Sequence, residues 1–428
     1  MRCLIGLLGV LGILGFVGPA QAAPDILTYR YQHHLFALRP SALPGWRSLR
    51  EVWMADGREI VPPPAFRVDG DAPPPLPTGV SVIRKNGWNT AAIRETLRQR
   101  IGAFLHRDAG RVTVHRTGSG DITFDGVGLT GREVNLELLA GLTVSALEQN
   151  VSEVLVPVIE TQPEITVTDP SLAELGIKEV ITIGESDYSN SPRNRLHNIA
   201  VGLNKFNGHL IQPDEVFSFV KVLGPVDGST GYLKELVIKG DRTVPDYGGG
   251  LCQVGTTAYR GVWEYGFPIV QRQNHSYTVS HYFPYGTDAT VYPPFIDMKF
   301  RNDLKSGLLI QTYQQGDFAY FIYYGTRDGR STELYGPYTW DKTEPPPDRT
   351  EETTDLPPGE RKKLNERIPG LKAIWHRIVR TSTGAEIGEP VFSSYEARPL
   401  FYQLGVERLP ESEPTVEEVN QAEPPRAF

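Results

Sequence analysis

Apolar positions in the first half of the chain predict a folded region over residues 79–169. Four residues recur at the four-residue intervals of an amphipathic helix: Ile93, Leu97, Ile101 and Leu105. Asn89 or Thr90 is the expected N-cap of this helix. The stretch "RVTVHRTGSGDITFDGVG" predicts a hairpin, "NLELLAGLTVSALEQN" a second helix and "EVLVPVIETQPEITVTD" a strand. These patterns together predict a small α+β domain.

A second region, residues 170–326, again mixes the two periodicities. A helix is expected over about 193–206, followed by a strand that ends at Phe219. Another helix is expected to begin near residue 252, because apolar residues recur there every four positions: Val254, Ala258 and Val262. The run "GFP" ends that pattern, and strands rich in Tyr, Thr and Ile follow. We therefore expect a central mixed α/β domain.

The remaining segments are richer in Pro and in acidic residues. They predict an extended N-terminal segment, an acidic Pro-rich linker, a small β-rich module and a disordered tail: residues 24–78, 327–360, 361–406 and 407–428. The fold class expected for the whole chain is accordingly mixed α+β with several domains.

Residues 1–22 have the form of a secretory signal peptide. A basic start precedes the apolar run "LIGLLGVLGILGFVG", and Ala20-Gln21-Ala22 offers a cleavage site. The run is shorter than the roughly 20 residues that a membrane span needs. We expect an exported, extracytoplasmic protein, held at a membrane only if this signal is retained as an anchor.

Charge and composition exclude several classes of partner. The net charge is −8 and no basic block stands out, so a nucleic-acid partner is not expected. The His and Cys residues lack the tight spacing of a metal site, and we predict neither a metal nor another cofactor.

Cys252 is the one cysteine outside the predicted signal peptide, because the other is Cys3. An exported protein with one cysteine cannot form an internal disulfide, so this thiol is unpaired or pairs with another molecule. An unpaired thiol is either a small buried hydrophobe or a reactive group. It stands where "GGGLCQ" turns into the predicted helix, whose N-terminal dipole favours a thiolate and an oxyanion. We predict that a substrate approaches the sulfur over the three glycines, Gly248, Gly249 and Gly250. Gln253 is expected to contact the substrate as well.

A reactive thiolate needs a proton shuttle, and two histidines follow the predicted helix. The helix covers roughly 20 Å, and a returning strand covers that distance in about six or seven residues. This arithmetic brings His275 level with Cys252 and carries His281 past it. His275 is therefore the expected base.

The group that orients the imidazole is left open between two aspartates. A hairpin turning near Tyr285 would place Asp297 opposite His275 and Asp288 near the turn. Arg260 and Arg272 are candidates for holding a carboxylate, and Arg272 is the predicted substrate contact of the two.

Five stretches between residues 175 and 325 resemble the VanW family: "NRLHNIAVGLNKFNGHLIQPDEVFSF", "LGPVDGSTGY", "GGGLCQVGTTAY", "QRQNHSYTV" and "GTDATVYPPFIDMKFRN". The family is named for a glycopeptide-antibiotic resistance cluster. The resemblance implies a cysteine L,D-transpeptidase that cross-links peptidoglycan, with Cys252 as nucleophile, His275 as base and Asp288 as third member. It also implies that 79–169 is a peptidoglycan-binding domain, and the C-terminal module weakly resembles cell-wall modules. The Ser-His-Gly-Cys signature of the better-known L,D-transpeptidases is absent.

Three functional hypotheses remain open. The first is an acyltransferase that forms a thioester between Cys252 and a peptidoglycan stem peptide, and the second is a hydrolase with the same residues. The third is a non-catalytic wall-binding protein in which the Gly-rich loop and aromatic residues cradle glycan or peptide: Tyr247, Tyr259 and Tyr277. A binding module has no need of a thiol at a helix start, so Cys252 separates the third hypothesis from the others.

Overall fold

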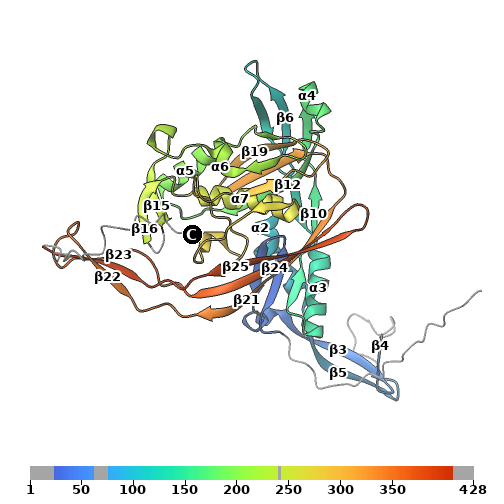
Figure 1. The fold of residues 1–428 in the computed structure, drawn as a ribbon. Helices are drawn as coiled ribbons and strands as arrows, with labels where there is room; N and C mark the ends of the chain where they lie inside the picture. Colours follow the sequence, from blue (N-terminus) through green and yellow to red (C-terminus); the bar gives the residue numbers. More distant parts are fainter. Residues whose placement is uncertain (1–23, 62–75, 240–241, 408–428) are drawn as a thin grey trace, which may run out of the picture. The chain divides into compact units, whose positions relative to one another are not determined.

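The computed structural model describes residues 24–61, 76–239 and 242–407, which form two compact units (Figure 1). The described part of the first unit consists of residues 24–31, Leu35–Leu105 and Val134–Val158, and that of the second of Gln32–His34, His106–Glu133 and 159–407. The predicted signal peptide and nearly all of the predicted tail lie outside the described residues. Helices and strands occur in both units, with strands in the majority, in agreement with the predicted mixed class.

Two small sheets and two main helices build the first unit. One sheet has the order β2-β1-β9 and the other β4-β3-β5: β1 (Leu27–Tyr31), β2 (His34–Leu38), β9 (Glu153–Leu155), β3 (Arg47–Ala55), β4 (Arg58–Ile60) and β5 (Val80–Trp88). The helical segments are α1 (Thr90–Leu97), a π-helical turn (Arg98–Gly102), α2 (Ala103–Leu105) and α3 (Leu136–Gln149), with 3₁₀ turns at Pro40–Ala42 and Pro44–Trp46. The N-terminal segment expected to be extended thus contains paired strands in its described part.

The helical periodicity near residue 90 is confirmed. The four apolar residues at four-residue spacing, Ile93, Leu97, Ile101 and Leu105, are all fully buried in one core with Trp46. The Asn89 side chain accepts a hydrogen bond from the Ala92 N–H at 3.1 Å, which identifies Asn89 as the N-cap.

A four-stranded sheet organises the second unit, with the order β12-β20-β19-β13: β12 (Glu179–Asp187), β20 (Phe318–Gly325), β19 (Leu308–Gln315) and β13 (Leu210–Ile211). Alternate residues of β20 face two different cores. Phe321 and Tyr323 pack with the helices α5 (Arg193–Asn204) and α7 (Leu251–Tyr265), whereas Tyr320 and Ile322 pack with a second sheet. The sheet is therefore buried on both faces.

The second sheet of this core has the order β11-β6-β7: β11 (Glu164–Val167), β6 (Arg111–Arg116) and β7 (Ile122–Val127). Val112 and Val114 of β6 are fully buried against the central sheet. The domain predicted over 79–169 is consequently divided between the two units, because the strands of its middle section bury their apolar face in the second unit.

Shorter elements complete the second unit before residue 330. They comprise a ribbon of β8 with β10, a hairpin of β15 with β16, a sheet of order β14-β18-β17 and two short helices: β8 (Gly131–Val134), β10 (Val158–Thr161), β15 (Lys234–Lys239), β16 (Arg242–Tyr247), β14 (Val216–Ser218), β18 (Lys299–Arg301), β17 (Ile269–Gln271), α4 (Pro170–Glu174) and α6 (Phe219–Leu223). Two 3₁₀ turns lie at Gly228–Thr230 and Ser280–Tyr282.

The C-terminal strands begin earlier than the sequence predicts. They form sheets of order β21-β24-β25 and β22-β26-β23: β21 (Ser331–Thr343), β24 (Gly370–Arg380), β25 (Glu386–Tyr395), β22 (Arg349–Thr353), β26 (Phe401–Gly405) and β23 (Arg361–Lys363). The segment 327–360, expected to be a linker, contains β21 and β22. The first sheet is anchored to α7, since Trp375 is fully buried and packs edge-on against Trp263, with ring centroids 5.6 Å apart.

Helix α7 lies against β12 at a distance that only glycine allows (Figure 1). A Cβ on Gly184 of β12 would lie 1.9 Å from the Thr257 carbonyl oxygen, and one on Gly261 of α7 would lie 2.6 Å from the Gly184 nitrogen. Both obstacles are backbone atoms, so a side chain cannot simply rotate out of the way.

No helix in the described part of the chain is long and apolar enough to span a membrane.

We predict that Gly184→Ala destabilises the protein by about 3 kcal/mol, because α7 and β12 must move apart to admit the methyl group. Urea unfolding of wild type and variant measures the change. Gly388→Ala is the matched control, since a Cβ at that strand position meets no atom within 4 Å. Equal stability of the Gly184 and Gly388 variants would contradict the close approach of helix and strand.

Candidate functional site

The three glycines before Cys252 form a turn that fits against the chain itself. Gly248 and Gly250 have φ angles of 80° and 116°, in the left-handed region that favours glycine. A Cβ on Gly249 would lie 2.8 Å from the Leu236 carbonyl oxygen of β15. Each glycine is thus explained by the turn and its packing, and substrate contact by these residues stays a prediction.

Cys252 lies in the first turn of α7, as the sequence predicts, and is partly exposed. In the protonated thiol form, Sγ can donate a hydrogen bond to the Val291 carbonyl oxygen, since the two atoms are 3.5 Å apart. Burial alone would raise the pKa of Cys252, but the positive charge of His275, with a smaller effect from Arg195, brings the pKa below its ordinary value. The surroundings therefore favour the thiolate.

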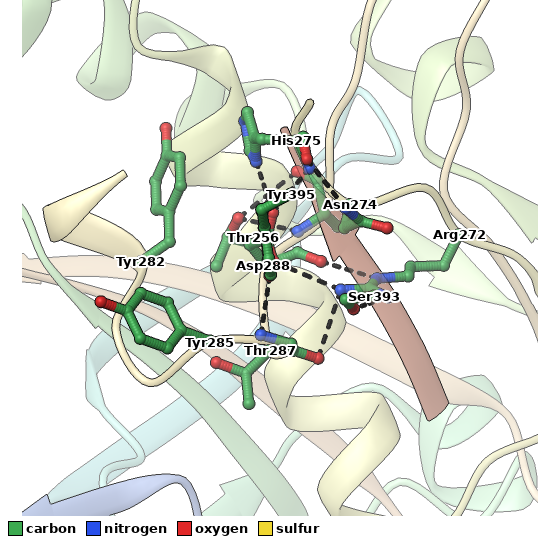
Figure 2. A network of polar contacts seen from close by, with 12 residues as sticks. Thr256, Arg272, Asn274, His275, Tyr282, Tyr285, Thr287, Asp288, Ser393 and Tyr395 are labelled. Atoms are coloured by element: carbon green, nitrogen blue, oxygen red, sulfur yellow. Dashed lines mark hydrogen bonds and ion pairs between the residues drawn. The ribbon is translucent and has the colours of Figure 1, made fainter. Parts of the chain in front are cut away.

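His275 lies in the irregular segment after β17, with its side chain buried. Its Nδ1 is 2.6 Å from Oδ2 of Asp288, and its own backbone N–H donates to the same oxygen at 2.8 Å (Figure 2). The other ring nitrogen, Nε2, is buried without a hydrogen-bond partner among the described residues. Burial would lower the pKa of His275, but the Cys252 thiolate and Asp288 outweigh it and raise the pKa to about 9.

Asp288 is the third member of the group. Its Oδ1 accepts from Tyr395 Oη of β25 at 2.5 Å and from Arg272 Nη2 at 3.3 Å (Figure 2). With the two contacts from His275, the two carboxylate oxygens have four donors, which matches their acceptor capacity. Although burial opposes ionisation, the bonds from His275 and the charge of Arg272 hold the pKa of Asp288 well below its usual range. The structure thus joins His275 and Asp288 directly, and the charge of His275 acts on Cys252.

Asp297, the alternative partner for His275, lies elsewhere. Its carboxylate accepts from Ser218 Oγ at 2.6 Å and from the Val220 N–H at 2.9 Å, at the start of α6. The hairpin that placed it opposite His275 does not form, because residues 272–298 are irregular apart from one 3₁₀ turn and an isolated bridge. Counting strand positions through this segment therefore gave the wrong register.

His281 occupies the 3₁₀ turn Ser280–Tyr282 and not the end of a long strand. The pKa of His281 is lowered, first by burial and then by the charge of Arg195, with Asp187 opposing. The next residue, Tyr282, stacks on the His275 ring with centroids 4.6 Å apart. His275 is accordingly the histidine whose charge acts on the thiol.

The predicted contacts of Gln253 and Arg272 are made within the protein. Gln253 is fully buried, and its amide accepts from Arg195 Nη2 at 3.0 Å and donates to Ser186 Oγ at 2.8 Å. Arg272 does hold a carboxylate, that of Asp288, and its Nε donates to the Asp288 carbonyl oxygen at 2.7 Å. Both side chains help to shape the site from inside.

Other residues singled out in the sequence also have internal roles. Arg260 is buried, and its Nη2 donates to the carbonyl oxygens of Tyr282 and Phe283 at 2.9 and 3.0 Å. Of the three tyrosines proposed to cradle a glycan, Tyr259 and Tyr277 are 1% and 8% exposed, and Tyr247 is 38% exposed. The described residues contain no group of three or more His, Cys, Asp or Glu side chains arranged to hold a metal ion.

Sequence reasoning missed Tyr395, Tyr282 and Arg195. Tyr395 is 107 residues from Asp288 and belongs to a module for which no role in the site was expected. Arg195 of α5 lowers the pKa of Cys252 through its charge, and Tyr282 of the 3₁₀ turn stacks on the His275 ring; no local spacing marks either residue.

Comparison with known proteins gives a match over the same region. Residues 194–323 match the family model "VanW like protein". The chain is 35% identical over 130 residues to the uncharacterized protein YoaR of Bacillus subtilis (strain 168), which is 30% of this chain and 42% of that protein. It is 32% identical over 117 residues to the vancomycin B-type resistance protein VanW of Enterococcus faecalis (strain ATCC 700802 / V583), which is 26% of this chain and 42% of that protein. The chain therefore spans less than half the length of these relatives.

We predict that His275→Ala slows alkylation of Cys252 by iodoacetamide near neutral pH and moves the pH midpoint of the reaction upward. Without the imidazolium, burial raises the pKa of the thiol against weaker opposition, so the thiolate appears only at higher pH. The rate of label incorporation between pH 5 and 10 measures the shift. His281→Ala is the control and is expected to leave the profile unchanged; the reverse pattern would assign the base to His281.

Proposed function

We propose that this VanW-family protein, whose residues 194–323 carry the family match, is a cysteine acyltransferase that acts on peptidoglycan stem peptides outside the cytoplasm. The observation that carries the proposal is the hydrogen bonding and charge of His275. Its Nδ1 is fixed by Asp288, while its buried Nε2 has no hydrogen-bond partner in the described structure and its charge lowers the pKa of Cys252. This is the arrangement that activates a thiol nucleophile.

In the proposed first half-reaction, the Cys252 thiolate attacks an amide carbonyl of the stem peptide. The C–S bond forms as the carbonyl becomes an oxyanion. The His275 imidazolium then gives its Nε2 proton to the amine as the C–N bond breaks, leaving a thioester on Cys252 and a neutral imidazole. Asp288 stabilises the imidazolium through Nδ1 and keeps the ring oriented.

In the second half-reaction, an acceptor amine attacks the thioester carbonyl. Neutral His275 takes the proton that the amine loses, and the C–S bond breaks to regenerate the thiolate and the imidazolium. The products are a new amide and the original ion pair. Water in place of the amine gives hydrolysis by the same residues, so the choice of acceptor separates a transferase from a hydrolase.

Two backbone N–H groups at the start of α7 already donate within the protein, so fewer of them can bind an oxyanion than at an uncapped helix end. The Leu251 N–H already donates to the Gly248 carbonyl oxygen at 3.0 Å, and the Gln253 N–H donates to that of Gly250 at 2.9 Å. The oxyanion would therefore be bound by the N–H of Cys252 itself, which lies between the N–H groups of Leu251 and Gln253 along the chain.

The relatives support an envelope role. One of them is named as a vancomycin resistance protein, and resistance to a glycopeptide antibiotic concerns the cell wall. The predicted signal peptide over residues 1–22 would place the protein outside the cytoplasm, and the region around 79–169 is the proposed peptidoglycan-binding part. The wall-binding alternative has less support, because two of the three tyrosines expected to cradle a glycan, Tyr259 and Tyr277, are buried.

We predict that incubation with peptidoglycan stem peptides adds one acyl group to the protein, at Cys252, and that Cys252→Ala abolishes both the adduct and turnover. Intact-mass spectrometry followed by peptide mapping measures the adduct, and product chromatography measures turnover. The thermal midpoint of the variant should stay within a few degrees of wild type, since the loss concerns the nucleophile and only a small buried volume. Unchanged turnover in the variant would end the acyltransferase proposal and leave wall binding.

A further inference from the structure

We propose that Tyr395, which lies beyond the VanW-like region, is a positioning residue for the Cys252–His275 pair and acts through Asp288. The C-terminal sheet that carries it would then be part of the reactive site and not a separate appendage. This inference rests on the proposed function only in taking Cys252 as a nucleophile. It does not depend on which acyl donor the protein uses.

The hydrogen bonds of Tyr395 fix the direction of its hydroxyl. Tyr395 Oη accepts from the Gly286 N–H at 2.7 Å, and Asp288 Oδ1 lies 2.5 Å away on its other side (Figure 2). Because Asp288 is held as a carboxylate, it can only accept, so the hydroxyl hydrogen must point to Oδ1. Burial and the neighbouring Asp288 charge raise the pKa of Tyr395, so the hydroxyl keeps this hydrogen over the whole working range of pH.

The same strand holds the segment that carries His275 and Asp288. Ser393 Oγ accepts from Arg272 Nη1 at 2.9 Å, and the Ser394 carbonyl oxygen accepts from Asn274 Nδ2 at 2.8 Å. Just past the strand, the Glu396 N–H donates to the Ser276 carbonyl oxygen at 2.7 Å. These contacts bracket His275 on both sides along the chain.

The neighbouring strand β24 completes the support. Trp375 Nε1 donates to the Tyr285 carbonyl oxygen at 2.7 Å, and a Cβ on Gly286 would lie 2.9 Å from Trp375 Cδ1. An irregular segment has few hydrogen bonds of its own to hold its shape. Residues 272–288 therefore owe much of their conformation to the C-terminal sheet.

The charges around the thiol come from several elements. Arg195 of α5 and His275 act on Cys252, Arg272 and His275 act on Asp288, and the Tyr282 ring covers His275. Tyr395 adds a neutral donor to this set, so its removal leaves the net charge unchanged. Loss of the hydroxyl should loosen Asp288, weaken its bond to Nδ1 and thereby reduce the stabilisation of the imidazolium.

The test is the pH profile of Cys252 alkylation in the full chain. We expect Tyr395→Phe to lower the rate with iodoacetamide near pH 7 by about three- to tenfold and to raise the pH midpoint, while the thermal midpoint changes little. Tyr338→Phe is the matched control, because this tyrosine belongs to the same sheet and is 51% exposed. Equal profiles for Tyr395→Phe and wild type would overturn the proposal.

A double-mutant cycle distinguishes positioning from a general loss of structure. If Tyr395 acts through Asp288, then Tyr395→Phe has no further effect in an Asp288→Asn background. An equal loss in both backgrounds would instead show a role independent of Asp288 and contradict the proposal. Should Tyr395→Phe fail to fold, Ser393→Ala decides, since it removes a second hydrogen bond from the same strand to the group around Asp288, that to Arg272: a lower rate supports the proposal and an unchanged rate overturns it.

The alkylation assay needs no peptidoglycan, so it fails or succeeds independently of the proposed function. A Tyr395 effect on alkylation without any turnover of stem peptides would keep the positioning role and remove the proposed substrate. Turnover of stem peptides by the wild-type protein, together with a Tyr395→Phe alkylation profile equal to that of wild type, would keep the proposed substrate and remove the positioning role.

Discussion

The buried carboxylate of Asp288 is the constraint around which the site is built. A buried charge must be paired and hydrogen-bonded, and removing the oppositely charged member of a buried ion pair costs about 3–5 kcal/mol. Asp288 meets this demand with donors from two parts of the chain: Arg272 and His275 in the segment after β17, and Tyr395 in β25. Satisfying the carboxylate therefore fixes the segment after β17, the imidazole and the C-terminal sheet at once.

Asp288 influences the pKa of Cys252 through the imidazole ring of His275. His275 is bound to Asp288 through Nδ1, and its charge lowers the pKa of Cys252, so the protonation states of the three groups are linked. Burial alone would oppose charge on Cys252, His275 and Asp288 alike, and in each case the neighbouring groups shift the pKa toward the ionised form. Such mutual dependence is typical of a site that holds a thiolate ready at neutral pH.

Local patterns in the sequence predicted the parts of the site that lie on regular elements. The four-residue spacing of Val254, Ala258 and Val262 correctly placed Cys252 at the start of a helix. His275 was reached by arithmetic that assumed a long strand, whereas β17 ends at Gln271 and the chain continues irregularly. The same assumption favoured Asp297 geometrically and failed, because an irregular segment has no register to count. Tyr395 could not be found by any local pattern, since its contact with Asp288 depends on the packing of a distant sheet.

The central claim is that Asp288 and Cys252 together hold His275 as an imidazolium at neutral pH. NMR titration of the His275 ring, selectively labelled with ¹⁵N, tests this most directly by following its protonation between pH 5 and 10. The account predicts that His275 keeps its second proton through neutrality and loses it near pH 9 in the wild-type protein. A ring that is already neutral at pH 7, titrating at or below its ordinary pKa of about 6.5, would contradict the account.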